Sequence, residues 1–391
     1  MDDLRVGVIG VCQRGTLADL AHRPGGGSRL VAGADPWPSA LAEFDRRLGG
    51  GMGLHADWRA LLDRRDVDAV FVTAPDHLHE EMVSAALEAG KAVYAEKPLA
   101  ITLEGCDRIL RTARATGSRL YVGHNMRHMP VVLKMREIIE SGAIGRVQAV
   151  WCRHFINYGG DAYFRDWHSE RRFTGGLLLQ KGAHDIDVIH WLAGARTDWV
   201  SGMGRLSVYD RCARRQAPRT ERFSARFDDA HWPPLALEDV SPDVDVEDHS
   251  MVMMQLANGA QASYLQCHYT PDAERNYTFI GDRGRLENEG DWGSCEVRVW
   301  TRRGARRDPD IVHRLKPEPG GHGGADTGVV QGFLDFVREG KPPLTSPVAA
   351  RDAVAVGVLG HASMRGDGAR LRVPPPEAEV AAYFGRGQAR A

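Results

Sequence analysis

The sequence predicts two domains: an α/β domain with a parallel, doubly wound sheet over residues 1–125, and an α+β domain with a large, mostly antiparallel open sheet over 126–391. Three observations predict this. The chain has 391 residues, about the length of two ordinary domains. Short apolar segments alternate with helical ones up to about residue 125. Beyond that point, several long strand-like segments follow one another along the chain.

The first domain is predicted from short apolar runs that are separated by amphipathic segments. The expected strands cover 4–10, 29–34, 68–73, 91–95 and 119–123. The expected helices cover 16–22, 38–48, 57–64, 77–89 and 102–116. Because the connections between them are short, the strands should pair in parallel with helices on both faces of the sheet.

The second domain is predicted from longer strands with alternating polar and apolar residues. We expect strands over 145–156, 197–209, 249–257, 260–270, 276–280 and 295–300. We expect helices over 130–140, 176–193, 325–339 and 348–364. Two Arg-rich stretches, 211–229 and 301–316, also contain acidic residues, so we interpret them as solvated loops.

The composition is that of an ordinary globular protein, with 43% hydrophobic and 26% charged residues. Lys and Arg (50) nearly balance Asp and Glu (52), which excludes the broad basic surface that nucleic-acid binding requires. The six cysteines form no CxxC pair, so we expect neither a disulfide framework nor a metal site. We see no signal peptide and no apolar run of about 20 residues, and expect a cytoplasmic protein.

The turn after the first strand resembles a dinucleotide fingerprint, which has the pattern G-x-G-x-x-G. Its residues are Gly10, Cys12, Gln13, Arg14 and Gly15, with cysteine at the middle glycine position. An acid, Asp35, ends the second strand, where it can accept hydrogen bonds from the adenosine ribose and repel a 2′-phosphate. We therefore expect NAD rather than NADP; the alternative is a strand, turn and helix without a ligand.

Three further segments carry a family resemblance. They are Thr73-Ala74-Pro75-Asp76-His77-Leu78-His79, Glu96-Lys97-Pro98-Leu99, and the run from Gly175 to Asp187 that contains Gln180-Lys181-Gly182-Ala183-His184. The chain resembles the Gfo/Idh/MocA family, the relatives of glucose–fructose oxidoreductase and inositol dehydrogenase. The resemblance implies an NAD-binding Rossmann domain and a substrate-binding and oligomerisation domain. It also implies a homodimer or homotetramer, and hydride transfer at a carbinol carbon of a sugar, sugar derivative or cyclitol.

The resemblance also implies roles for individual residues. It places Lys97 and His184 as catalytic residues. The cofactor-binding residues that it adds to the phosphate turn and Asp35 are Ala74, Pro75, His77, His79, Glu96, Lys97, Asn125 and Trp167. The substrate-binding residues are Lys97, Arg127, Tyr163, Arg165, Gln180 and His184.

The chemistry of the two catalytic candidates fits this assignment. A lysine at a strand end can donate a hydrogen bond to the reacting oxygen and stabilise a developing alkoxide. Histidine titrates near neutral pH, as proton exchange requires. The family commonly has an aspartate four residues before this histidine, whereas this chain has Gln180, which cannot take a proton. Lys181 points about 100° away from Gln180 on the helix and is a poor substitute.

Two other functions stay open at this point. The chain could retain NAD and oxidise a sugar transiently, to allow elimination or glycoside cleavage, before reducing it again. Alternatively, it could be a non-catalytic sensor of NAD and sugar that keeps the fold.

Overall fold

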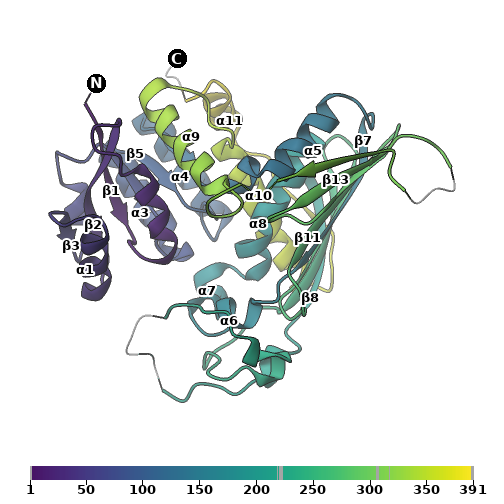
Figure 1. The fold of residues 1–391 in the computed structure, drawn as a ribbon, viewed down its shortest axis with the longest axis horizontal. Helices are drawn as coiled ribbons and strands as arrows, with labels where there is room; N and C mark the ends of the chain where they lie inside the picture. The colour runs from purple at the N-terminus through teal and green to yellow at the C-terminus, as the bar shows by residue number, and fades with distance from the viewer. Residues whose placement is uncertain (1, 218, 220–222, 305–307, 317, 389–391) are drawn as a thin grey trace. The chain divides into compact units, whose positions relative to one another are not determined.

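A computed structural model describes residues 2–217, 219, 223–304, 308–316 and 318–388 of the chain (Figure 1). The chain divides into two units, and each is described by itself. The first unit comprises Met1–Asn125, Asp326–Val354 and Pro376–Ala391. The second unit comprises Met126–Ala325 and Ala355–Pro375.

The first unit contains a parallel sheet, as predicted. Its strand order is β3-β2-β1-β4-β5-β6, that of a dinucleotide-binding doubly wound fold. The strands are β1 (Leu4–Ile9), β2 (Ser28–Ala34), β3 (Gly53–His55), β4 (Ala69–Val72), β5 (Ala92–Ala95) and β6 (Leu120–Val122). Strand β3 was not predicted, because it is three residues long and follows directly on a run of glycines.

The helices of the first unit lie at or near predicted segments, except α11, which was not predicted. They are η1 (Gln13–Ala21), α1 (Pro38–Arg47), α2 (Trp58–Leu62), η2 (Asp76–Leu78), α3 (His79–Glu88), α4 (Leu103–Thr116), α9 (Ala325–Glu339) and α11 (Ala378–Gly385). Helix α4 shows why the local sequence folds this way. The Thr102 side chain accepts a hydrogen bond from the Gly105 amide at its start, and Gly117 ends it in the left-handed conformation.

The first unit extends beyond the expected range 1–125, because helix α9 and the C-terminal segment pack on its sheet. The Phe333 ring of α9 lies 5.1 Å from Phe71, 5.7 Å from Tyr94 and 5.8 Å from Tyr121, centroid to centroid. The side chain of Gln388 hydrogen-bonds both the amide and the carbonyl of Leu120 in β6. These contacts agree with the inclusion of 326–354 and of the described residues from 376 on in the first unit, although a single boundary after 125 was expected.

The second unit contains a mostly antiparallel sheet, as predicted. Its order is β14-β13-β12-β11-β7-β10-β9-β8-β15, with β7 and β10 parallel. The strands are β7 (Val147–Phe155), β8 (Thr197–Arg205), β9 (His249–Leu256), β10 (Gln261–Cys267), β11 (Glu274–Gly281), β12 (Arg285–Glu289), β13 (Cys295–Trp300), β14 (Ile311–Leu315) and β15 (Leu371–Arg372). Strand β14 corrects the expectation that 301–316 is all loop, since Ile311–Leu315 pairs with β13.

The remaining helices belong mainly to the second unit. They are η3 (Asn125–His128), α5 (Pro130–Glu140), α6 (Gly159–Tyr163), η4 (Trp167–Ser169), α7 (Arg171–Thr174), α8 (Leu177–Ala193), η5 (Tyr209–Arg211), η6 (Asp229–His231), η7 (Pro234–Ala236) and α10 (Pro347–Arg365). Helix α8 packs closely on the sheet. A Cβ on Gly182 would lie 2.9 Å from the Tyr264 ring of β10, so glycine permits this approach.

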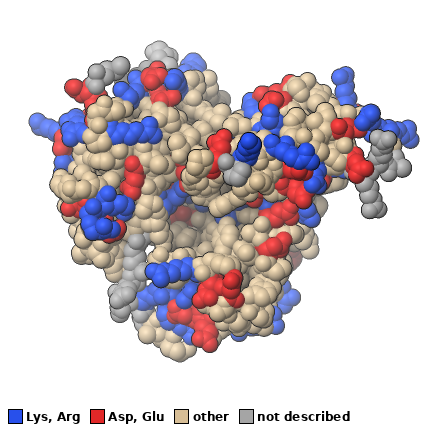
Figure 2. Space-filling model, in the orientation of Figure 1, with Lys and Arg blue, Asp and Glu red and all other residues tan. Residues whose placement is uncertain are grey.

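The two faces of the second sheet differ in polarity. Ring and amide side chains on the α8 side, such as Tyr264 and Gln266, are buried. On the other face, alternate positions of neighbouring strands expose Trp151, Met203, Met251 and Met253. On the surface shown in Figure 2, basic and acidic side chains are interspersed. None of the helices in the described segments has the length and apolarity needed to span a membrane.

Candidate functional site

The phosphate turn after β1 needs glycine at two of its three fingerprint positions. Gly10 has a φ of +85°, and a Cβ there would lie 2.8 Å from the Ala74 amide nitrogen. A Cβ on Gly15 would lie 2.0 Å from the Gly10 carbonyl oxygen, far inside van der Waals contact. The Thr73 hydroxyl donates to that same carbonyl at 2.7 Å. The turn is therefore tightly closed, as close approach of a pyrophosphate to the backbone requires.

The middle fingerprint position, Cys12, tolerates a side chain because its backbone is extended, with φ −114° and ψ 171°. Its thiol lies 3.3 Å from the Asp35 carboxylate, which also accepts from the Val11 amide at 3.3 Å and the Trp37 amide at 3.0 Å. The carboxylate at the end of β2 is thus fixed in position. The following residue, Gln13, takes the positive φ (44°) and begins a 3-10 helix.

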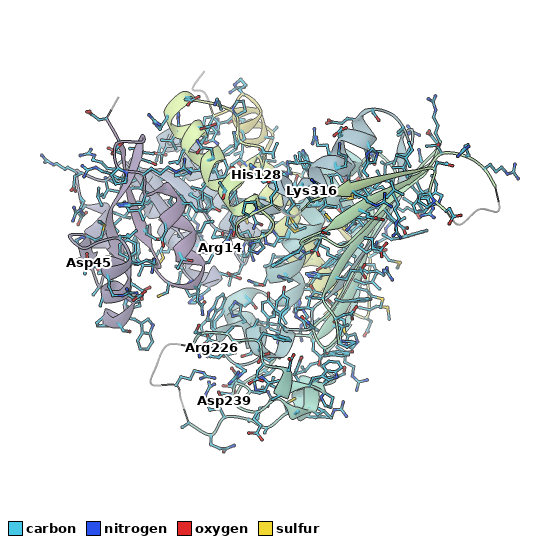
Figure 3. The ribbon with its side chains drawn as sticks, viewed as in Figure 1. Arg14, Asp45, His128, Arg226, Asp239 and Lys316 are labelled. Atoms are coloured by element: carbon cyan, nitrogen blue, oxygen red, sulfur yellow. The ribbon has the colours of Figure 1, made fainter. Side chains whose placement is uncertain are left out.

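Three of the expected cofactor residues form one polar chain with an acid that the sequence did not indicate. Arg14, labelled in Figure 3, lies with Nε 2.5 Å from Glu96 Oε1 and Nη1 3.0 Å from Asp326 Oδ2. Asn125 Nδ2 donates to Asp326 Oδ1 at 2.9 Å. Burial raises the pKa of Glu96, but the charges of Arg14 and Lys97 outweigh it, so this pKa is lowered. These hydrogen bonds and ion pairs fix the positions of side chains that follow β1, β5 and β6.

The loop after β4 is fastened to the Lys97 segment by a buried histidine. His79 Nδ1 lies 2.7 Å from the Pro98 carbonyl, and Nε2 lies 2.9 Å from the Ala74 carbonyl. Burial lowers the pKa of His79, and a neutral imidazole donates to one of these carbonyls. This expected cofactor residue therefore fixes the position of the loop that carries Ala74, Pro75 and His77.

Lys97, after β5, has carboxylates as neighbours. Its own amide donates to Glu96 Oε2 at 2.8 Å. Asp76 is buried, and within the described residues its Oδ2 has no hydrogen-bond partner. Burial raises the pKa of Asp76 to about 8; the Lys97 charge opposes this rise, and the Glu96 charge adds to it. Asp76 was not among the expected site residues.

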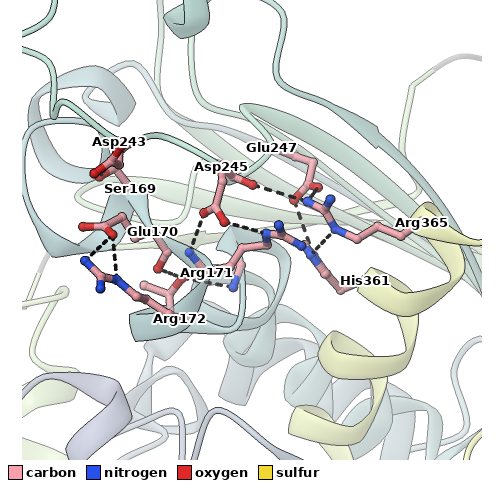
Figure 4. Close-up of polar contacts among 11 residues, drawn as sticks. Ser169, Glu170, Arg171, Arg172, Asp243, Asp245, Glu247, His361 and Arg365 are labelled. Carbon is pink, nitrogen blue, oxygen red and sulfur yellow. Dashed lines mark hydrogen bonds and ion pairs between the residues drawn. The ribbon is translucent and has the colours of Figure 1, made fainter.

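In the second unit, the start of α8 is held by a charged cluster (Figure 4). Arg365 Nη2 lies 2.6 Å from Glu247, and His361 Nδ1 lies 3.4 Å from the same carboxylate. Gly176, which precedes α8, has a φ of +104°, and a Cβ there would lie 2.7 Å from the His361 ring. The double glycine thus lets the helix begin directly against this histidine.

Helix α8 carries the expected catalytic histidine and the glutamine one turn before it. Gln180 and His184 are both buried. Asp187, one turn further on, receives a bidentate pair from Arg127, with contacts of 2.7 and 2.6 Å. The Arg127 guanidinium also lies 4.8 Å from the centroid of Trp191. The expected substrate residue Arg127 therefore has its charge neutralised within the second unit.

Lys181 lies near the rings of two tyrosines. Its Nζ is 5.5 Å from the ring centroid of Tyr158 and 5.8 Å from that of Tyr163. Burial raises the pKa of Tyr158, but the positive charges of Lys181 and Arg275 outweigh it, so the pKa is lowered. Tyr163 was an expected substrate residue, whereas Tyr158 was not. Lys181 is three residues before His184, a spacing that makes them neighbours on the helix.

Beneath α8 lies a buried ion pair between Asp185 and Arg275. Arg275 Nε lies 2.7 Å from Asp185 Oδ1, and its Nη1 lies 2.7 Å from Asp291. His154 and the Tyr277 hydroxyl also contact Asp185. Burial raises the pKa of Asp185, but Arg275 and His154 hold it well below its usual range. Sequence reasoning missed this network, because its members are distributed over α8, β7 and β11.

Two other expected residues lie between α6 and α7. Trp167 stacks on His168, with centroids 3.7 Å apart. Arg165 lies 3.6 Å from Asp161 and 3.4 Å from Asp239, which Figure 3 labels. No cluster of three or more His, Cys, Asp or Glu side chains suited to a metal ion occurs in the part of the chain that the structure describes.

Comparison with known proteins matches both units to models of one family. Residues 4–124 match the GFO_IDH_MocA model of the oxidoreductase family, described as an NAD-binding Rossmann fold. Residues 136–373 match the model of the C-terminal alpha/beta domain of that family.

Two curated relatives and one solved structure illustrate the similarity. A 1-carboxy-3-chloro-3,4-dihydroxycyclohexa-1,5-diene dehydrogenase of Comamonas testosteroni is 33% identical over 206 residues, 52% of this chain and 51% of that protein. A levoglucosan dehydrogenase of Pseudarthrobacter phenanthrenivorans is 30% identical over 274 residues, 67% of each chain. A levoglucosan dehydrogenase structure with NADH and L-sorbose is 22% identical, covers 96% of this chain and 100% of that one, and has a TM-score of 0.78.

The first of these relatives is matched over only about half its length, so its activity is not transferred to this chain. The family models, in contrast, together span both units and most of the sequence, from the first strand to residue 373. The chain therefore belongs to the Gfo/Idh/MocA oxidoreductase family, with an NAD-binding Rossmann domain and the C-terminal α/β domain of that family.

Proposed function

We propose that this protein is an NAD-dependent oxidoreductase that transfers a hydride between the nicotinamide and a carbinol carbon of a sugar, sugar derivative or cyclitol. The observation that carries the proposal is the setting of Lys97, which follows β5 beside the carboxylates of Glu96 and Asp76. The names of the two curated relatives, which describe dehydrogenases of a dihydroxylated ring and of levoglucosan, support this substrate class.

The first unit has the features that NAD requires. Gly10 and Gly15 allow the pyrophosphate to approach the turn, and Asp35 is fixed where it can accept hydrogen bonds from the adenosine ribose. A 2′-phosphate would be repelled by the same carboxylate, which favours NAD over NADP. When bound, NAD supplies the hydride acceptor or donor.

Side chains of the protein then bind the reacting oxygen of the substrate and transfer its hydroxyl proton. Lys97 donates a hydrogen bond to the reacting oxygen and stabilises negative charge that develops on it. His184 takes the hydroxyl proton in the oxidation and returns it in the reduction. Gln180 hydrogen-bonds a substrate hydroxyl but exchanges no proton. Arg127 acts by holding Asp187, because its charge is already paired.

The direct test is to incubate the full-length protein with NAD and a panel of sugars, sugar derivatives and cyclitols, and to follow the absorbance of NADH at neutral pH. We expect turnover with at least one member, and little with NADP. Normal NAD binding without turnover across the panel would contradict a dehydrogenase. Regulation of a partner by NAD and sugar, without turnover, would identify a sensor instead.

A second candidate function is favoured by Gln180, a buried neutral residue in place of the carboxylate common in the family. An enzyme that retains NAD and oxidises its substrate only transiently has less need of net proton release. In that case the purified protein would contain NAD, and the product of glycoside cleavage or of elimination would form with no net change in NADH.

We further propose that the exposed face of the second sheet binds a second copy of this chain. Met203 lies opposite Met251, and Met253 lies two residues further along the same strands, opposite Ser201. With Trp151 on β7 these side chains form an exposed apolar surface, unusual for a face in contact with water. The expected assembly is a homodimer or homotetramer. We also keep a cytoplasmic location as a proposal, tested by cell fractionation.

Light scattering on the full-length protein tests the assembly. The wild type should be dimeric or tetrameric at micromolar concentration, and Met253→Glu should shift it toward the monomer, because a charge buried in an apolar interface is costly. Leu133→Glu replaces an exposed residue of α5 and serves as the control. A monomeric wild type would contradict the proposal.

A further inference from the structure

Lys181 keeps a positive charge that forms no ion pair with an acid of the described residues. In the part of the chain that the structure describes, no Asp or Glu carboxylate forms an ion pair with it; its neighbours are the two tyrosines and the cation Arg275. The nearby acids, Asp185 and Asp291, are paired with Arg275. The preceding residue, Gln180, is neutral. Lys181 and Tyr158 are half-buried, so part of each side chain is open to solvent.

A second observation indicates that a ligand binds here. His268 is fully buried, and neither of its ring nitrogens has a hydrogen-bond partner among the described residues. Its ring lies edge-on to Tyr163, with centroids 5.2 Å apart, and close enough to Lys181 for that charge to lower the histidine pKa. A buried imidazole without a partner is costly unless another molecule supplies one.

We propose that Tyr158, Tyr163, Lys181 and His268 form a subsite for a carboxylate group of the substrate. The lysine provides the charge, and the tyrosine hydroxyls and the imidazole N–H provide neutral hydrogen-bond donors. The proposal rests on the proposed function and narrows its substrate class to polyols that carry an acid group, such as uronic acids.

A carboxylate fits this subsite better than a phosphate. Among the four side chains of the subsite, the ammonium group of Lys181 carries the positive charge, and it balances one negative charge. A phosphate monoester carries nearly two negative charges at pH 7 and usually requires an arginine or several basic groups. Arg275 does not serve, because its guanidinium is paired with two carboxylates.

Matched substrate pairs test the proposal. The full-length protein with NAD is assayed on D-glucuronate against D-glucose, and on D-galacturonate against D-galactose, with glucose 6-phosphate as a further arm. We expect kcat/KM to be at least tenfold higher for the acid of a pair. Lys181→Met should raise KM for the acid about tenfold and change KM for the neutral sugar less than twofold. A wild type that prefers the neutral sugars or the phosphate ester overturns the proposal.

Three variants separate a binding role from a structural one. Lys181→Arg keeps the charge and should recover most of the affinity for the acid. Tyr158→Phe keeps the ring and should raise the acid KM severalfold, which tests the subsite even if Lys181→Met does not fold. Lys134→Met removes a lysine that is paired with Glu137 in the same unit, and should change neither KM. An equal loss on acid and neutral sugars in Lys181→Arg and Tyr158→Phe, with Lys134→Met unchanged, overturns the proposal.

Direct binding distinguishes failure of this inference from failure of the proposed function. If no substrate turns over, the affinity of D-glucuronate and D-glucose for the NADH-loaded protein is measured by calorimetry. Tighter binding of the acid that is lost in Lys181→Met supports the subsite although the dehydrogenase reaction fails. Equal or absent binding of the two overturns the subsite by itself.

Discussion

Two lysines, one in each unit, lie in opposite electrostatic surroundings. Lys97 follows a parallel strand, and its neighbours are the carboxylates of Glu96 and Asp76. Lys181 lies on a helix over an antiparallel sheet, and its neighbours are two tyrosines and Arg275. The first lysine has acidic side chains beside it, and the second forms no ion pair with an acid among the described residues.

This difference indicates different tasks for the two groups. A lysine among carboxylates stays charged near a nicotinamide, whose oxidised form is itself cationic, and can polarise an oxygen without repelling the cofactor. A lysine without a carboxylate attracts an anion from solution instead. The predictions that follow test whether the surroundings decide the task, and they run from the largest expected effect to the smallest.

Lys97→Met should reduce kcat by about 10³-fold on acid and neutral substrates alike, because it removes the group that stabilises charge on the reacting oxygen. The Kd for NAD should change less than threefold. Steady-state rates and NADH fluorescence measure the two effects. Lys341→Met, which removes an exposed lysine in the first unit, is the control. A loss confined to acid substrates would assign Lys97 the role proposed for Lys181.

Arg275→Met should destabilise the protein by about 3–5 kcal/mol, because it leaves the fully buried Asp185 without its main counter-charge. Arg14→Met should cost less, since the Arg14 side chain is 29% exposed and water can reach its partners. Urea unfolding at pH 7 measures both losses. A larger loss for Arg14→Met would show that the charge network of the first unit is the more strongly desolvated one.

The fold was predictable where local sequence carries the signal. Short apolar runs mark β1, β2 and β4, and the glycines that follow β1 mark the phosphate turn. Strand β14 was missed because Ile311–Leu315 lies at the end of a polar, Arg-rich stretch. The place of α9 was missed for another reason. Phe333 packs on a sheet more than 200 positions earlier in the sequence, and no local pattern reports such a contact.

In the candidate site, only the residues that belong to recognisable sequence motifs were predictable. Asp326 joins Arg14 and Asn125, but only tertiary structure brings these three together. Lys181 was set aside because it points about 100° from Gln180. The relevant neighbour is His184, three residues on, from which it is separated by about 60° around the helix. A helical-wheel comparison with the histidine, rather than with the glutamine, would have found it.

Gly15→Ala should weaken NAD binding at least tenfold and destabilise the protein by about 1–3 kcal/mol, because the added Cβ overlaps the Gly10 carbonyl. Cys12→Ala should change both by much less, since Cys12 has an extended backbone that already carries a side chain. Fluorescence titration with NADH and thermal unfolding measure the pair. Equal losses of NAD affinity and stability in the two variants would contradict the view that the tight turn requires glycine at position 15.

The variant Asp76→Asn tests whether the acid beside Lys97 is protonated, through the pH dependence of the free energy of unfolding. The pKa of Asp76 is raised, to about 8 in the folded chain, so folding favours the protonated acid. As pH rises from about 4 to 8 the unfolded chain loses this proton first, and the free energy of unfolding falls. Asparagine does not titrate, so the variant should be more stable than the wild type by more than about 1 kcal/mol at pH 8, and by much less at pH 5. Urea unfolding of the NAD-free protein at both pH values measures this. A constant difference between the two proteins would mean that Asp76 is ionised throughout, with Lys97 as its partner.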